Sequence, residues 1–191
     1  ADLRIYRDPV KDHYKITEIV CREDYGGIRR RVSRYFAASL WAEVILRSPG
    51  AAEPVELYTL LLECLMALHS SDQAVEHGLS VQFMWRYLGY SGLQPDLNIC
   101  AACDRSLGSS ASGYLSEANG DVRCVECSFP GDSVFSPGAR AYLRHTGRLS
   151  PSRAAAVRMQ DEKALCAVLY RMVQGALGTP LAALESGISW I

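Results

Sequence analysis

Four of the seven cysteines form two C-x-x-C pairs, Cys100-Ala-Ala-Cys103 and Cys124-Val-Glu-Cys127. Twenty residues (104–123) separate the pairs, a spacing typical of four-cysteine zinc sites. Each pair can direct two sulfurs at one point, and the loop lets the second pair face the first. The pattern therefore predicts that Cys100, Cys103, Cys124 and Cys127 bind one Zn²⁺ ion. Four thiolates leave no position for a catalytic water, so the expected role of the ion is structural.

Other chemistry for these cysteines stays open at this point. Two separate reactive C-x-x-C motifs, disulfides, or iron in place of zinc are the alternatives. The remaining cysteines, Cys21, Cys64 and Cys166, lie in apolar stretches and are expected to be small core residues. An odd cysteine count with metal-type spacing favours a reducing compartment over a disulfide framework. We therefore expect a cytoplasmic protein.

Composition excludes several broad classes. The chain has 191 residues, of which 49% are hydrophobic, enough for one sizeable core or two modest ones. Its formal net charge of -1 gives no global attraction to nucleic acid or to an anionic membrane. We find no targeting segment, no apolar run long enough to span a bilayer, and none of the common phosphate-loop, metalloprotease or nucleophile-elbow motifs.

Local positive charge is carried by two arginine clusters. The first cluster could extend a path for DNA, and the second could neutralise phosphates or hold an acidic protein tail, although a solvated helix face is the more ordinary interpretation. Tyr25 and Tyr35 could stack on bases beside the first cluster, but Tyr35 also falls on an apolar helical stripe, which favours core packing. The clusters are Arg29, Arg30, Arg31 and Arg34, and then Arg140, Arg144 and Arg148.

The elements that must position these residues are mostly helical. Helical periodicity covers residues 28–45, 73–88 and 161–177, and residues 55–68 are apolar on almost every side, which predicts a helix central to the core. Ser-Pro pairs at 136–137 and 150–151 begin two further helices. Gly147 is expected to close the first of them in a left-handed conformation, and Gly178 to end the last helix.

Two segments are not helical. Residues 3–6 and 14–20 are strand-like and flank a turn-rich stretch, which predicts a hairpin that packs on the helices or ends a larger sheet. Between residues 97 and 130 the helical period vanishes, and Asn119-Gly120 predicts a hairpin turn within the cysteine segment.

The expected fold is mainly α: a helical bundle domain with an inserted four-cysteine zinc ribbon, preceded by a β-hairpin. The helical domain would comprise residues 26–97 and 131–191, and the ribbon residues 98–130. Residues 1–25 would form the hairpin.

The sequence resembles the bacterial RecO family of recombination mediators, which act in DNA repair. The resemblance rests on Arg86-Tyr87-Leu88-Gly89-Tyr90 and on Gln94-Pro95-Asp96-Leu97-Asn98-Ile99 leading into the first cysteine pair. The second cysteine pair and Phe135-Ser136-Pro137 follow in the family's order. Residues 1–31 look like the last strands of the family's N-terminal OB barrel and the entry to the first helix. Most of that barrel would lie before Ala1.

The resemblance implies a non-enzymatic function in DNA recombination and repair. A RecO protein would help load recombinase onto single-stranded DNA coated by single-strand-binding protein, would act with RecR, and would anneal complementary strands. The implied partners are RecR, single-strand-binding protein and single-stranded DNA, the last mainly through the barrel, with no membrane and a nucleoid-associated, cytoplasmic location. The family's basic C-terminal segment has no counterpart in the apolar stretch 181–191. Alternatives are a zinc-ribbon adaptor in transcription or translation, and a thiol-disulfide redox protein using one C-x-x-C.

Overall fold

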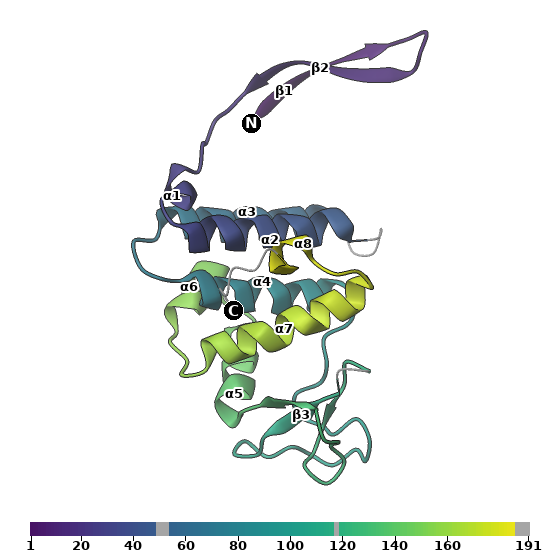
Figure 1. Ribbon diagram of the computed structural model, residues 1–191, viewed down its shortest axis with the longest axis vertical. Coiled ribbons are helices and arrows are strands. Elements are labelled where there is room, and N and C mark those ends of the chain that lie inside the picture. The colour runs from purple at the N-terminus through teal and green to yellow at the C-terminus, as the bar shows by residue number, and fades with distance from the viewer. Residues whose placement is uncertain (49–53, 117–118, 186–191) are drawn as a thin grey trace.

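The N-terminal hairpin forms as predicted but stands apart from the helices. A computed structural model describes residues 1–48, 54–116 and 119–185, and in it β1 (Asp2–Asp8) pairs antiparallel with β2 (His13–Val20). The hairpin projects from the helical body (Figure 1). Leu3 lies opposite Ile19 and Ile5 opposite Ile16, yet all four of these side chains are at least half exposed. Of the two arrangements expected for the hairpin, packing on the helices therefore does not occur.

The first helical pattern is split into two helices, α1 (Gly26–Arg29) and α2 (Val32–Arg47). The break occurs because Arg31 adopts an extended backbone conformation (φ -135°, ψ 133°). One face of α2 is buried, as expected, but Tyr35 is 62% exposed and Val32 is exposed as well. Core packing of Tyr35 is thus a wrong prediction, because both side chains lie on the side of α2 that faces away from its buried residues.

The centre of the bundle is α4 (Glu76–Tyr90) and not α3 (Pro54–Ser70). Most residues of α4 are buried, and it contacts α2, α3, α6 and α7. The ring of Trp41 stacks on Phe83 with centroids 5.5 Å apart, and its indole N–H donates to Ser80 Oγ at 3.1 Å. The prediction that residues 55–68 are central was wrong: α3 buries one face and exposes Tyr58 and Met66 on the other.

The C-terminal half adds α5 (Pro137–Thr146), α6 (Pro151–Ala156), α7 (Glu162–Leu177) and α8 (Ala182–Glu185). Ser136 caps α5 by accepting a hydrogen bond from the Ala139 N–H. Gly178 is left-handed (φ 64°) and ends α7 as predicted, whereas Gly147 has φ -58°, so the left-handed ending of α5 was a wrong prediction. The carbonyl of Thr146, the last residue of α5, instead accepts from the Leu149 N–H at 3.0 Å and from the Arg86 guanidinium at 3.3 Å, without a left-handed residue.

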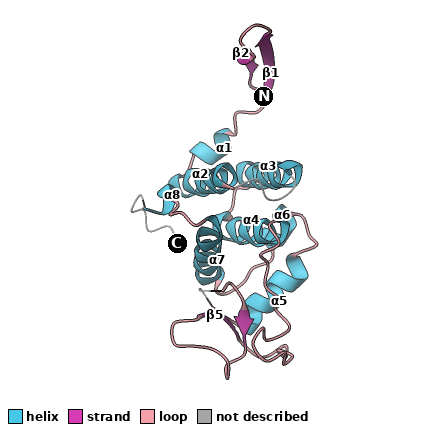
Figure 2. Cartoon of the chain, turned by 90° about the vertical axis from the view of Figure 1, so that its right-hand side faces the viewer, coloured by secondary structure: helices cyan, strands magenta, loops and turns pink. Residues whose placement is uncertain are grey.

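A small sheet lies at the end of the body opposite the hairpin (Figures 1 and 2). Its order is β4 (Val122–Arg123), β3 (Gly113–Leu115), β5 (Ser133–Phe135), all antiparallel. Gly120 is left-handed (φ 69°), and the Ser116 N–H donates to the Asp121 carbonyl at 2.9 Å, which confirms the predicted hairpin turn. The fold is therefore mainly α, with a cysteine-containing segment inserted between α4 and α5. No helix within the described ranges has the length and apolar character needed to cross a bilayer.

Gly27 joins the hairpin side of the molecule to α3 through a close backbone approach. A Cβ atom at Gly27 would lie 2.4 Å from the His69 carbonyl oxygen. We expect Gly27→Ala to lower the free energy of unfolding by about 1–3 kcal/mol because the backbone must shift. Urea titration of the chain measures this change. Gly175→Ala is the matched control, since a Cβ there meets nothing within 4 Å. Equal stability of the two variants would contradict the packing described.

Candidate metal centre

Local backbone hydrogen bonds shape each cysteine pair into a tight turn. The Cys100 N–H donates to the Arg105 carbonyl at 2.9 Å, and the Asp104 N–H donates back to the Cys100 carbonyl at 2.9 Å. Asp104 is left-handed (φ 55°) and reverses the chain after Cys103. In the second turn the Cys127 N–H donates to the Cys124 carbonyl at 3.1 Å. These turns hold both sulfurs of each pair on one side of the chain.

The two turns converge, so that the four sulfurs lie within 4.8 Å of one another. Sulfurs around a tetrahedral ion with Zn–S bonds of about 2.3 Å are separated by roughly 3.8 Å. The sulfurs of Cys103 and Cys124, which come from different turns, are 3.9 Å apart. Cys100 and Cys124 are buried, Cys127 is half-buried and Cys103 is exposed. Four soft sulfur donors at this spacing could hold one metal ion.

The electrostatics of the cluster favour a bound cation. Burial opposes ionisation of Cys100, but backbone N–H groups of Cys124, Ala102 and Cys103 outweigh it and lower its pKa to about 6. Hydrogen bonds with the sulfurs of Cys124 and Cys103 raise the pKa of Cys127 to about 12. The protein alone therefore stabilises some thiolates and not others. A divalent ion would supply the charge that lets all four ionise.

The other three cysteines do not join this cluster. Cys64 and Cys166 are fully buried in the helical core, where burial raises the pKa of each thiol, so they stay protonated. Their prediction as core residues is confirmed. Cys21 is exposed, and its thiol donates to the Glu23 carbonyl, so its assignment to the core was wrong. It follows β2, whose apolar side chains are exposed as well.

The first arginine cluster is divided by the fold. Arg34 is 4% exposed, its Nε lies 3.4 Å from a Glu76 carboxylate oxygen, and its guanidinium donates to the Gln73 carbonyl at 2.9 Å. Arg34 therefore holds α2 to α4 and to the residues just before α4. Arg29, Arg30 and Arg31 are exposed, and Arg29 pairs with Asp24 at 3.0 Å.

The second cluster is divided in the same way. Arg140 is 1% exposed, and its guanidinium donates to carbonyl oxygens of the cysteine segment. Arg144 and Arg148 are exposed, and Arg144 donates to the Asn98 side chain at 3.2 Å. Arg140 and Arg144 thus form no common surface stripe, although their spacing suggested one. Sequence reasoning missed this because the buried face of α5 includes Arg140 beside Ala139, Tyr142 and Leu143.

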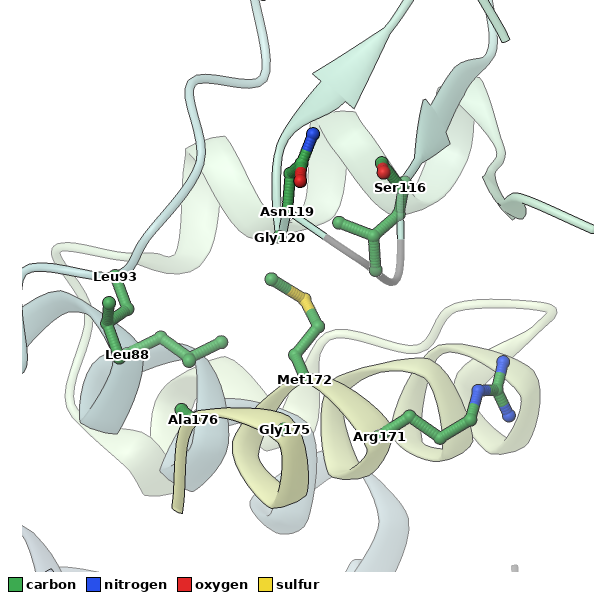
Figure 3. Close-up of a pocket in the computed structure, with 10 residues that line it drawn as sticks. Leu88, Leu93, Ser116, Asn119, Gly120, Arg171, Met172, Gly175 and Ala176 are labelled. Carbon is green, nitrogen blue, oxygen red and sulfur yellow. The ribbon is translucent and has the colours of Figure 1, made fainter. Parts of the chain in front are cut away.

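A cavity of about 390 Å³ lies between the β3–β4 turn and α7, and no sequence pattern indicated it (Figure 3). Leu88 and Leu93 form one side of it, and Met172 extends from α7 toward Ser116 (Figure 3). Residues of both the cysteine segment and the helical body therefore line this cavity.

The chain is similar in sequence to several known proteins. The family described as "Recombination protein O C terminal" matches residues 29–185. "DNA repair protein RecO" of Desulfatibacillum aliphaticivorans is 30% identical over 162 residues, covering 76% of this chain and 61% of that protein. The protein of the same name from Anaeromyxobacter sp. (strain Fw109-5) is 30% identical over 153 residues, covering 76% of this chain and 59% of that protein. The protein of the same name from Streptomyces coelicolor is 32% identical over 120 residues, covering 62% of this chain and 47% of that protein.

These matches define the class of the helical domain with its inserted cysteine segment: it is a C-terminal domain of recombination protein O type. The chain belongs to the RecO family. It spans about 60% of the length of the curated relatives from Desulfatibacillum and Anaeromyxobacter. Both of these relatives carry the name DNA repair protein.

Metal retention should depend on the four clustered cysteines and on pH. We expect about one metal ion per chain, lost in Cys124→Ala and retained in Cys21→Ser, as measured by elemental analysis after gel filtration. Because the pKa of Cys127 lies well above neutral, metal binding must release its proton, so affinity should rise with pH and fall on acidification. A metal content unaffected by Cys124→Ala would contradict a shared site.

Proposed function

We propose that this protein is a non-enzymatic mediator of DNA recombination and repair. The family match over residues 29–185 is the observation that carries the proposal. In this proposal the protein helps to load recombinase onto single-stranded DNA coated by single-strand-binding protein, and it anneals complementary strands. Binding energy alone performs this work: the protein favours one arrangement of partners on the strand over another. RecR is the proposed protein partner, and the cytoplasm and nucleoid are the proposed location.

Among the described residues, the exposed arginines of the two clusters are the proposed DNA contacts. Arg144 and Arg148 are exposed at the C-terminal end of α5 and just beyond it, and Arg29, Arg30 and Arg31 are exposed near the hairpin. Arg34 and Arg140 are left out because their guanidinium groups are buried and hydrogen-bonded within the protein. An OB barrel ending in β1 and β2 would supply the main DNA contact. The exposed apolar face of that hairpin supports its assignment to a larger barrel, whose core would cover this face.

We further propose that the ion is zinc and that its role is structural. The observation that supports this is the donor set: four cysteine sulfurs within 4.8 Å of one another, with no carboxylate or imidazole among them. Cys100, Cys103, Cys124 and Cys127 would hold it. When bound, the ion would cross-link a polar segment to itself.

Binding of the protein to single-stranded DNA should weaken with salt in proportion to the number of arginines that contact phosphates. In the double variant Arg144→Gln/Arg148→Gln, we expect the negative slope of log K against log salt to become less steep by about 1.4, or ~0.7 per lost contact. Fluorescence anisotropy of a labelled dT oligonucleotide measures the slope in the 191-residue chain and in any longer protein that contains it. Lys163→Gln, which changes an exposed charge on α7, is the control and should leave the slope unchanged.

Co-elution with RecR tests the mediator proposal separately from the arginine assignment. The chain, or a longer protein that contains it, should elute with RecR on gel filtration and should bind single strands. Failure of both to do either would rule out the mediator function. Binding to both partners with an unchanged slope in the double variant would remove only Arg144 and Arg148 from the DNA interface.

A further inference from the structure

Arg140 is a buried cation without a carboxylate partner. It is among the largest fully buried side chains of the described residues, and no Asp or Glu oxygen within those ranges lies in ion-pair distance of it. Burial and the nearby Arg144 lower the pKa of its guanidinium, which means that the charged form is disfavoured there. A buried charge of this kind persists only where polar atoms replace the lost water.

The replacement comes entirely from one short segment of chain. Arg140 Nε donates to the Leu97 carbonyl at 2.9 Å, and its terminal nitrogens donate to Leu97 at 2.5 Å, Leu107 at 2.9 Å, Gly108 at 2.9 Å and Ala111 at 2.5 Å. A guanidinium has five N–H groups, so its donor capacity is used in full. All four acceptor residues flank or follow the first cysteine pair.

These carbonyls are in place only while the cysteine segment is folded. The Leu107 N–H donates to the Asn98 carbonyl at 2.6 Å, and the Cys100 N–H donates to the Arg105 carbonyl at 2.9 Å, so the same loop forms the first cysteine turn. The sheet also packs on the arginine: a Cβ at Gly113 would lie 3.4 Å from Arg140 Cδ and 2.7 Å from Val122 Cγ1. If the loop opened, Arg140 would lose every acceptor together.

Arg140 is held just as firmly on the helical side. It lies in α5, where the Tyr142 hydroxyl donates to the Ala154 carbonyl at 3.0 Å and the Gln82 side-chain amide donates to Thr146 Oγ1 at 2.9 Å. These bonds tie α5 to α6 and to the central helix α4. A continuous chain of contacts therefore runs from the cysteine turns through Arg140 into the helical core.

We propose that Arg140 is a positioning residue that couples occupancy of the metal site to the stability of the helical body. The inference rests on the metal binding set out under the proposed function. Bound metal holds residues 97–111 in the shape that satisfies the buried guanidinium, and the guanidinium in turn holds that loop in the shape that ligates the metal. By thermodynamic linkage each side must strengthen the other by the same factor.

The coupling can be measured as a cycle between metal and residue 140. Zinc transfer from the 191-residue chain to a chromogenic chelator gives the metal affinity, and helix ellipticity during heating gives the stability of the body with and without metal. We expect Arg140→Met, which keeps an unbranched apolar stem but removes the guanidinium donors, to weaken zinc binding about tenfold or more. It should also shrink the stability difference between metal-bound and metal-free protein. Arg153→Met, which changes an exposed arginine on α6, should change neither quantity.

Each outcome decides the proposal. A folded Arg140→Met variant with wild-type zinc affinity would overturn it, and so would an equal loss in Arg153→Met. If Arg140→Met does not fold, amide exchange of the wild-type chain decides, since metal removal should then deprotect α5 as well as the cysteine segment. Protection of α5 that was indifferent to metal would overturn the coupling. A wild-type chain that bound no zinc would instead defeat the metal proposal itself.

Discussion

The segment between α4 and α5 has too few apolar side chains to form a hydrophobic core of its own. It is held instead by three sets of contacts. Residues 98–130 are rich in glycine, serine and cysteine. Only a few of their side chains, such as Leu107, Leu115 and Val122, reach the core. Convergence of four sulfurs supplies one anchor, and the carbonyl contacts of Arg140 supply another. The third is the contact of the small sheet with the helices. A polar loop thereby becomes a defined part of the body without a hydrophobic core of its own.

The helical body distributes its apolar surface unevenly. The core is organised around α4, which is buried along most of its length, while α2 and α3 bury one face and leave apolar residues such as Tyr35, Tyr58 and Met66 on the other. The hairpin repeats this pattern, since Leu3, Ile5 and Ile19 share an exposed face. Side chains of this kind gain about 25 cal/mol per Å² when covered. The hairpin and the outer helices α2 and α3 thus carry exposed apolar side chains, and the cysteine segment lies at the other end of the molecule (Figure 1).

Sequence patterns predicted those features that depend on residues close in the chain. Cysteine spacing predicted the cluster, Asn119-Gly120 predicted the turn, and the Ser136-Pro137 pair predicted the start of α5. Features that depend on which face meets which neighbour were missed. Apolar periodicity suggested that α3 is central because it is the more hydrophobic helix, yet the more polar α4 is central, since Ser80 and Gln82 find hydrogen-bond partners inside the bundle. Tyr35 and Cys21 were placed in the core for the same reason and lie outside it.

The arginines show most clearly why charge cannot be assigned to a surface from spacing alone. Arg34 and Arg140 are each spaced with exposed arginines, but each is buried and satisfies backbone carbonyls from a distant segment. Lysine could not replace Arg140, because a single ammonium has three donors at one point and cannot span four carbonyls. An apolar side chain in place of Arg140 would leave the carbonyls of Leu97, Leu107, Gly108 and Ala111 without this donor. Leaving these carbonyls without donors would cost free energy of folding, and this cost makes position 140 specific for arginine. The guanidinium provides the several N–H groups that the loop carbonyls need.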